Sequence, residues 1–372
     1  MKIQKIETIP LKFESGKTIW DAVHRFSARQ ALIVEIHTDE GITGYGESAY
    51  FGGPIVSTAT VIEKELAPFF LGQNPFQVEY LWDLVYRTTV QHGRRGLVIA
   101  ALSGIDIALW DIIAKAVNKP LYQILGGFRE KVEAYASSGF YSQDKGVKEL
   151  CREMESYAAA GFKTMKMKVA GLGTHEDLER VRSVRQAIGN KIDLAVDANS
   201  NWDVPTARWM GKRLEELGVK WIEEPVSPDD VEGSAIVAQS TVIPISGYEQ
   251  ETTRYGFRPL IEKRAVHIVQ PDVTWSGGIT ECKKIAALAC SWNLPCRPHV
   301  FSSGVCLAAN LQFIASIPNG DLLELDRNPN PLRDELINES LSPDAMGVVT
   351  LPDRPGLGID LNPEIIKKYR CD

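Results

Sequence analysis

The sequence predicts an α/β fold: a modified (β/α)8 barrel of the TIM type, joined to an α+β cap. Two observations predict the barrel. Short β-prone runs between Lys166 and Glu324 each end in a charged residue, and a helix-like segment follows each run. The end residues recur at intervals of 23 to 29 positions, about the length of one strand, one helix and two loops; they are Lys168, Asp197, Glu223, Glu249, Asp272, His299 and Glu324.

Repeated strand–helix units imply a parallel sheet, and in a closed barrel the carboxyl ends of all strands meet at one face. We therefore expect the seven end residues to face one central space. The first barrel strand is predicted over Val132–Ser137, with its helix over Val147–Ala160. The later helices are predicted over His175–Ala187, Val204–Leu217, Asp230–Ala238, Thr252–Glu262, Gly278–Ser291 and Ser303–Ser316.

The cap is predicted from a run of strands followed by a run of helices over residues 1–127. Ala31–Thr38 and Ile42–Glu47 form a hairpin around the turn Asp39-Glu40-Gly41. Gly16–Arg29 is interpreted as a loop that covers the substrate, with a solvated connection as the alternative. The barrel is predicted over 128–327, and residues 328–372 are expected to return to the cap.

Composition limits the classes of function. The 372 residues carry a net charge of −7, which argues against a protein that binds the phosphates of nucleic acids. No apolar run is judged long enough to span a membrane, and the first residues read as a strand rather than a signal peptide. The six cysteines show no Cys-x-x-Cys spacing, so a reducing cytoplasm is expected. A homo-oligomer acting on a small molecule is the expected assembly.

Three carboxylates, Asp197, Glu223 and Glu249, end successive predicted strands. Neighbouring strands lie about 4.8 Å apart, so the three side chains could converge on one hard cation. Oxygen ligands without Cys or His favour Mg2+ over Zn2+. The alternative is that each carboxylate caps the helix that follows it.

Lys166 and Lys168 are two residues apart on one predicted strand, so both side chains lie on one face. Inside a barrel, mutual repulsion and partial desolvation would lower the pKa of Lys168 and make it a general base. The alternative is a strand whose two lysines face solvent.

His299 and Asp272 end neighbouring predicted strands. A carboxylate on one imidazole nitrogen would fix the tautomer and raise the basicity of the other nitrogen; the alternative is a histidine with a purely structural role. Lys168 and His299 would approach a central substrate from opposite sides. Such a site suits removal of a proton next to a carboxylate, because the cation takes the charge of the enediolate. Glu324 could hydrogen-bond the second enediolate oxygen if it is protonated.

With these motifs in view, the chain resembles the mandelate racemase / muconate lactonizing enzyme group of the enolase superfamily, for which a Lys or His base with Mg2+ is already a known pattern. The resemblance rests on Ala101–Asp111, Lys166-Met167-Lys168, Val196–Asn199, Trp221–Pro225, Gln270-Pro271-Asp272, Gly277-Gly278, Pro298-His299 and Pro355–Gly358.

The resemblance implies one Mg2+ per subunit, bound by Asp197, Glu223 and Glu249, with Glu223 rather than Glu224 as the ligand. It implies Lys168 and the His299–Asp272 pair as acid and base groups. It also implies that Lys166 and Asn199 lie near the substrate carboxylate or the metal. One departure is Tyr248, where many relatives carry Gly.

Within the group, the chain is most similar to acid-sugar dehydratases and galactarolactone cycloisomerases, on Leu325–Arg333 and Arg25-Phe26. Specificity would then depend on His24, Arg25, Tyr141 and Trp275. The expected reaction is proton abstraction from a sugar acid or its lactone, followed by β-elimination. A racemase or epimerase of a 2-hydroxy acid is the second hypothesis, and a non-enzymatic binding barrel is the third.

Overall fold

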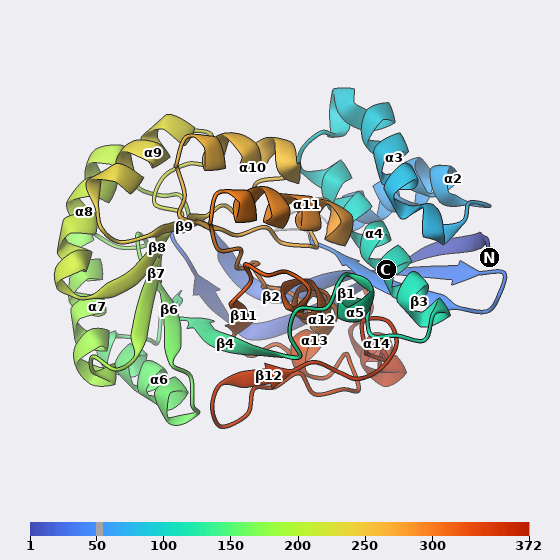
Figure 1. Cartoon of the computed structure of the whole chain (residues 1–372). Helices are drawn as coiled ribbons and strands as arrows, with labels where there is room; N and C mark the ends of the chain where they lie inside the picture. Colours follow the sequence, from blue (N-terminus) through green and yellow to red (C-terminus); the bar gives the residue numbers. More distant parts are fainter. Residues whose placement is uncertain (50–54, 372) are drawn as a thin grey trace.

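The computed structural model describes residues 1–49 and 55–371, and it contains two sheets (Figure 1). The cap sheet has the order β3-β2-β1-β5, with bounds β1 (Ile3–Trp20), β2 (Arg25–Thr38), β3 (Thr43–Ser48) and β5 (Tyr141–Ser142). The cap helices that follow are α1 (Ile55–Thr60), η1 (Val61–Leu66), α2 (Ala67–Phe70), η2 (Pro75–Gln77), α3 (Val78–Gly93), α4 (Leu97–Ala116) and α5 (Leu121–Ile124).

The barrel sheet is parallel, in the order β10-β9-β8-β7-β6-β4-β11. Its strands are β4 (Lys131–Ser138), β6 (Thr164–Lys168), β7 (Asp193–Asp197), β8 (Val219–Glu223), β9 (Ile245–Gly247), β10 (Ile268–Val269) and β11 (Leu322–Asp326). The expected strand before His299 is reduced to a single parallel bridge between Val269 and Cys296. Pro295 and Pro298 lack backbone N–H groups, so this segment cannot form a continuous ladder.

Helices cover the outside of the barrel strands, as Figure 1 shows for α6 through α11. Each predicted helix between residues 174 and 316 is confirmed to within two residues. The observed bounds are α6 (Val147–Ala159), α7 (Thr174–Ile188), α8 (Val204–Glu216), α9 (Val231–Ser240), α10 (Thr253–Glu262), α11 (Gly278–Ser291) and α12 (Gly304–Ala315). The barrel prediction is therefore confirmed in a modified form.

The prediction of a loop over Gly16–Arg29 is wrong. β1 and β2 form one long antiparallel hairpin that pairs out to Trp20 and Arg25, and β1 then pairs with β5. Only a short turn remains, in which Asp21 Oδ1 accepts hydrogen bonds from the backbone N–H groups of residues 23 and 24 at 2.8 and 2.6 Å. A shift in the pairing register between Glu14 and Ile19 breaks the alternation of side chains, which explains why the sequence pattern hides the strands.

α4 is the central helix of the cap. By length and composition it could cross a membrane, contrary to the expectation from the sequence, but 83% of its apolar window is buried inside the protein. It packs on β3 at very short range, because both elements carry glycine. A Cβ added to Gly46 would lie 2.0 Å from the carbonyl oxygen of Gly104.

The chain after β11 contacts both parts of the molecule. β12 (Val348–Thr350) pairs antiparallel with β4 of the barrel, and α13 (Pro331–Asp334) precedes it. Arg370, after α14 (Pro363–Tyr369), bridges to Leu11 of β1. The carboxylate of Asp111 on α4 accepts the backbone N–H of Leu357 at 2.7 Å. The tail therefore ties the barrel to the cap.

We expect Gly46→Ala to destabilise the protein by about 1–3 kcal/mol, because the new methyl group must displace the α4 backbone. Thermal unfolding measured by circular dichroism tests this. Gly211→Ala is the matched control: its Cβ would meet Thr241 at an ordinary 3.4 Å inside α8, where Ala is favoured over Gly. A melting temperature as high for Gly46→Ala as for the control would contradict the proposed close packing.

Candidate active site

The register of the parallel strands brings the predicted residues together. Lys168 pairs with Asp197, and Asp197 pairs with Glu223 across β6, β7 and β8. Glu249 follows β9 and Asp272 follows β10. A cavity opens above this ring, and most of its lining side chains are polar: Asp21, His24, Phe26, Ala28, Arg29, Gln30, Ala49, Ser137, Phe140, Lys168, Asn199, Glu249, Asp272, His299, Phe301, Ser302 and Glu324.

Both lysines of β6 point into the barrel. Lys166 is 1% exposed, and its Nζ bonds Glu223 and lies 2.8 Å from Glu324 Oε1 and 3.6 Å from Asp197 Oδ2. Lys168 Nζ lies 2.5 Å from the same Asp197 oxygen. The alternative in which these lysines face solvent is therefore wrong.

The prediction of a lowered pKa for Lys168 is also wrong in this structure. Burial does lower the pKa, and so does the neighbouring Lys166. The carboxylates of Asp197, Asp21 and Glu249 together outweigh both effects and raise the pKa above its ordinary value. The sequence argument counted the repulsion between the lysines but undercounted the acids packed around them.

His299 lies between two carboxylates. Its Nδ1 is 2.9 Å from Asp272 Oδ2, and its Nε2 is 3.2 Å from Glu249 Oε2. Asp272 is itself fixed, because its Oδ1 accepts hydrogen bonds from the backbone N–H and the hydroxyl of Thr274 at 2.8 and 2.7 Å. Burial lowers the pKa of His299, but Glu249 and Asp272 raise it to about 10. The predicted pairing of His299 with Asp272 is formed.

Glu324 does not match the expectation of a protonated acid. Burial raises the pKa of Glu324, but the positive charges of Lys166 and His299 outweigh burial and lower the pKa to about 2. Its Oε2 accepts the backbone N–H of Val300 at 3.1 Å. The contacts with Lys166 and with this N–H group therefore favour the ionised form of Glu324 in this structure.

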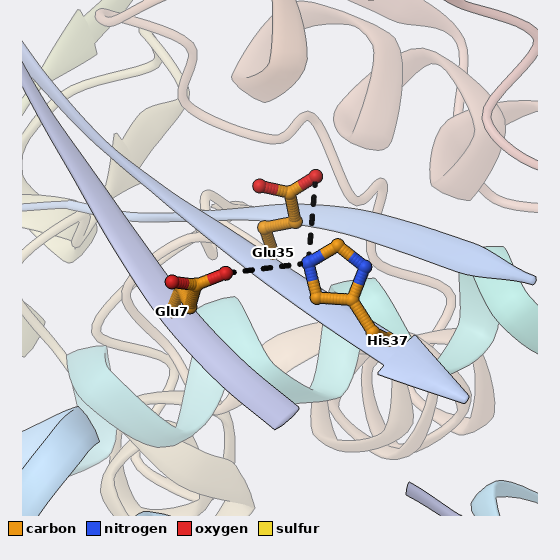
Figure 2. Close-up of side chains that lie close together, drawn as sticks. All are labelled: Glu7, Glu35 and His37. Carbon is orange, nitrogen blue, oxygen red and sulfur yellow. Dashed lines mark ion pairs between the residues drawn. The ribbon is translucent and has the colours of Figure 1, made fainter. Parts of the chain in front are cut away.

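The ligand atoms of the three expected metal ligands, Asp197, Glu223 and Glu249, do not all lie within 4.8 Å of one another in this structure. The described residues contain one group of His, Cys, Asp or Glu side chains with ligand atoms within 4.8 Å of one another: Glu7, Glu35 and His37 of the cap sheet (Figure 2). That group is one cross-strand ion pair and one pair within β2, with His37 Nε2 at 3.5 Å from Glu7 of β1 and 3.7 Å from Glu35 of β2. In the barrel the carboxylates repel one another, and each pairs with a cationic side chain of the protein instead.

The donor set nevertheless fits a hard divalent cation. Asp197 and Glu223 are fully buried, and neither caps a helix, since Asp203 and Asp230 take that role for α8 and α9. Burial and the neighbouring acids Asp197 and Glu324 raise the pKa of Glu223 to about 7, although Lys166 lowers it. The buried Oδ1 of Asn199 lacks a hydrogen-bond partner among the described residues. Oxygen donors of this kind suit Mg2+.

Two of the five expected substrate residues line the cavity, Asn199 and His24. Arg25 is exposed and lies over the ring of Trp20, at 5.0 Å from its centroid. The hydroxyl of Tyr141 donates to Asp177 at 2.6 Å, away from the lining residues. Trp275 donates its indole N–H to the backbone carbonyl of residue 250 at 2.9 Å. Arg25, Tyr141 and Trp275 are thus not among the residues that line this cavity, and their role in substrate binding stays a prediction.

Sequence reasoning expected the segment of the β1–β2 hairpin to cover the substrate and named His24 within it, but it missed Arg29 and the residues that the later loops contribute. Arg29 lines the cavity from β2 and bonds Asp326. Phe26, Phe140 and Phe301 pack together beside it, with ring centroids 5.4 to 6.0 Å apart. The one available signal was the alternation Phe26, Ala28, Gln30 within a segment that we interpreted as a loop.

Comparisons with known proteins agree with this architecture. Residues 13–126 match the family model of the mandelate racemase / muconate lactonizing enzyme N-terminal domain, and residues 149–365 match the enolase C-terminal domain-like model. The chain is 41% identical to arabinonate dehydratase of Saccharolobus solfataricus, over 92% of this chain and 91% of that protein. It is 38% identical to D-galactarolactone cycloisomerase of Agrobacterium fabrum, over 100% and 99% of the two chains.

Two solved structures share the fold over essentially the whole chain. The 3,6-anhydro-D-galactonate cycloisomerase from Zobellia galactanivorans superposes with a TM-score of 0.91 at 35% identity, over all of both chains. A racemase from Streptomyces coelicolor A3(2) with bound magnesium gives 0.92 at 28% identity, over 99% of this chain and 100% of that one. With both of its parts matched, this chain belongs to the mandelate racemase / muconate lactonizing enzyme family of the enolase superfamily.

Proposed function

We propose that the protein is a Mg2+-dependent dehydratase or cycloisomerase of a sugar acid or its lactone. One observation carries the proposal. In the order of the strands, Lys168 and His299 flank Asp197, Glu223 and Glu249, and both border the same cavity. An acid–base group on each side of a buried, acid-rich centre suits abstraction of a proton next to a carboxylate.

Each group has a role that follows from its contacts. Lys166 Nζ contacts three carboxylates, Asp197, Glu223 and Glu324, and in the proposed role its charge would also stabilise a substrate carboxylate. Lys168 and His299 exchange protons with the substrate from the two sides. Asp272 orients His299 through Nδ1, and Nε2, which pairs with Glu249 in this structure, would react once that carboxylate binds the metal. When bound by Asp197, Glu223 and Glu249, one Mg2+ per subunit would stabilise the charge that develops on the substrate.

The lining favours elimination over racemisation. A dehydratase or cycloisomerase must hold several hydroxyl groups, and Asp21, Gln30, Ser137 and Ser302 offer partners for them around the cavity. Relatives named arabinonate dehydratase, D-galactarolactone cycloisomerase and D-xylonate dehydratase support the same class of substrate. A racemase of a 2-hydroxy acid stays the second candidate, because the same two bases could return the proton to the opposite face.

Glu223→Gln should abolish Mg2+ binding and lower kcat at least about 1,000-fold, since it removes one of three anionic ligands. Isothermal titration calorimetry with MgCl2 and turnover of a sugar-acid library check this. Glu232→Gln is the control, because that side chain is 68% exposed and pairs only with Lys263 among the described residues. Wild-type Mg2+ affinity in Glu223→Gln would reject the metal assignment.

Lys168→Ala and His299→Asn should each remove one route of proton exchange. We expect turnover to fall by about 100- to 10,000-fold in both variants, the range of a lost acid or base group. Exchange of the substrate α-proton for solvent deuterium, followed by NMR, distinguishes the two sides. Exchange at the wild-type rate in both variants would contradict the two-base assignment.

A further inference from the structure

Arg29 is a buried cation at the cavity wall with incomplete partners. It is 6% exposed and lines the cavity from β2. Its Nη2 bonds Asp326, and its guanidinium carbon lies 3.8 Å from the centroid of the Phe301 ring. Its Nη1 is buried and has no hydrogen-bond partner among the described residues. An unsatisfied, buried and charged donor is costly unless something binds it.

Asp326 cannot satisfy Arg29 alone, because other groups share its carboxylate. Arg333 Nη1 lies 3.4 Å from Asp326 Oδ2, the oxygen that bonds Arg29. The backbone and side-chain N–H groups of Asn328 bond Oδ1 at 3.1 and 2.6 Å. Arg333 has a second acid, Asp334, but that carboxylate is 55% exposed and screened by solvent. Positive charge therefore remains beside the cavity.

The position of Arg29 sets it apart from the reacting groups. Asp326 and Glu324 lie two residues apart on β11, so their side chains share one face. Asp326 is about 7 Å further along the strand, toward the barrel mouth. Glu324 contacts Lys166 at the inner end. Arg29 thus marks an outer subsite that the far end of an extended sugar acid would reach.

We propose that Arg29 binds a second carboxylate, so that the preferred substrates are sugar acids with an acidic group at both ends. The proposal rests on the function proposed above. The two N–H groups of Nη1 and the positive charge suit an anion better than a neutral hydroxyl group. The Phe301 ring lies against the guanidinium of Arg29, and the rings of Phe26 and Phe140 pack on Phe301.

D-galactarate and D-galactonate are the matched probes, because they differ at one end, a carboxylate against a hydroxymethyl group. Binding is measured by calorimetry with Mg2+ present, in the Lys168→Ala background, so that the result does not depend on turnover. We expect galactarate to bind at least about tenfold more tightly than galactonate. Adding Arg29→Gln should weaken the binding of galactarate by about 10- to 100-fold and the binding of galactonate by less than about threefold.

Two further variants complete the test. Arg152→Ala, at an arginine of α6 whose side chain is 64% exposed, should leave both affinities unchanged. Arg29→Lys keeps the charge, so it should recover part of the preference for galactarate. The proposal would be overturned if Arg29→Gln weakened the binding of both acids equally. It would also be overturned if the Lys168→Ala protein with Arg29 intact bound galactarate no more tightly than galactonate. If the wild type binds galactarate as expected but turns over neither acid, the proposed function fails while the outer subsite stands.

Discussion

The fold of the barrel and its chemistry both depend on one buried ammonium group. Lys166 Nζ contacts carboxylates from three strands, Asp197 on β7, Glu223 on β8 and Glu324 on β11. These strands lie on both sides of β6 and β4 in the sheet, so the lysine joins side chains from across the ring. The acids would repel one another without a cation between them. Removing one partner of a buried ion pair costs about 3–5 kcal/mol, because the remaining charge is left uncompensated.

The cap also contributes a buried charged residue, Glu47, which holds part of the site in place. Glu47 on β3 is fully buried and bonds the hydroxyl groups of Ser302 and Ser303, and it accepts the backbone N–H of Cys306 at 2.8 Å. These contacts hold the start of α12, directly after the segment that carries His299. The cap therefore positions part of the inner site as well as its rim. Burial raises the pKa of Glu47 to about 7, and the serine and backbone donors oppose that rise.

The inner ring could be predicted from the sequence because it follows from regular geometry. Parallel strands with short connections place each end residue at one face, so Lys168, Asp197 and Glu223 became neighbours by register alone. The electrostatics could not be predicted in the same way. The pKa of Lys168 depends on how many acids lie within a few ångströms of it, and a list of strand ends does not give those distances. Nor does that list show that Asp197, Glu223 and Glu249 each pair with a cationic side chain.

The outer subsite was hidden by a different cause. Arg29 reaches the cavity from the long β1–β2 hairpin, in which β1 also pairs with β5, a contact between residues more than 100 positions apart. Neither the bulge in β1 nor this pairing leaves a periodic signal. Proton transfer near a carboxylate thus depends on the strand ends of the barrel, whereas recognition of the far end of the substrate depends on a hairpin from another part of the chain. The ion pairs of Lys166 described above are made with residues of β7, β8 and β11, so changes in the hairpin can alter substrate choice without removing a partner from these pairs.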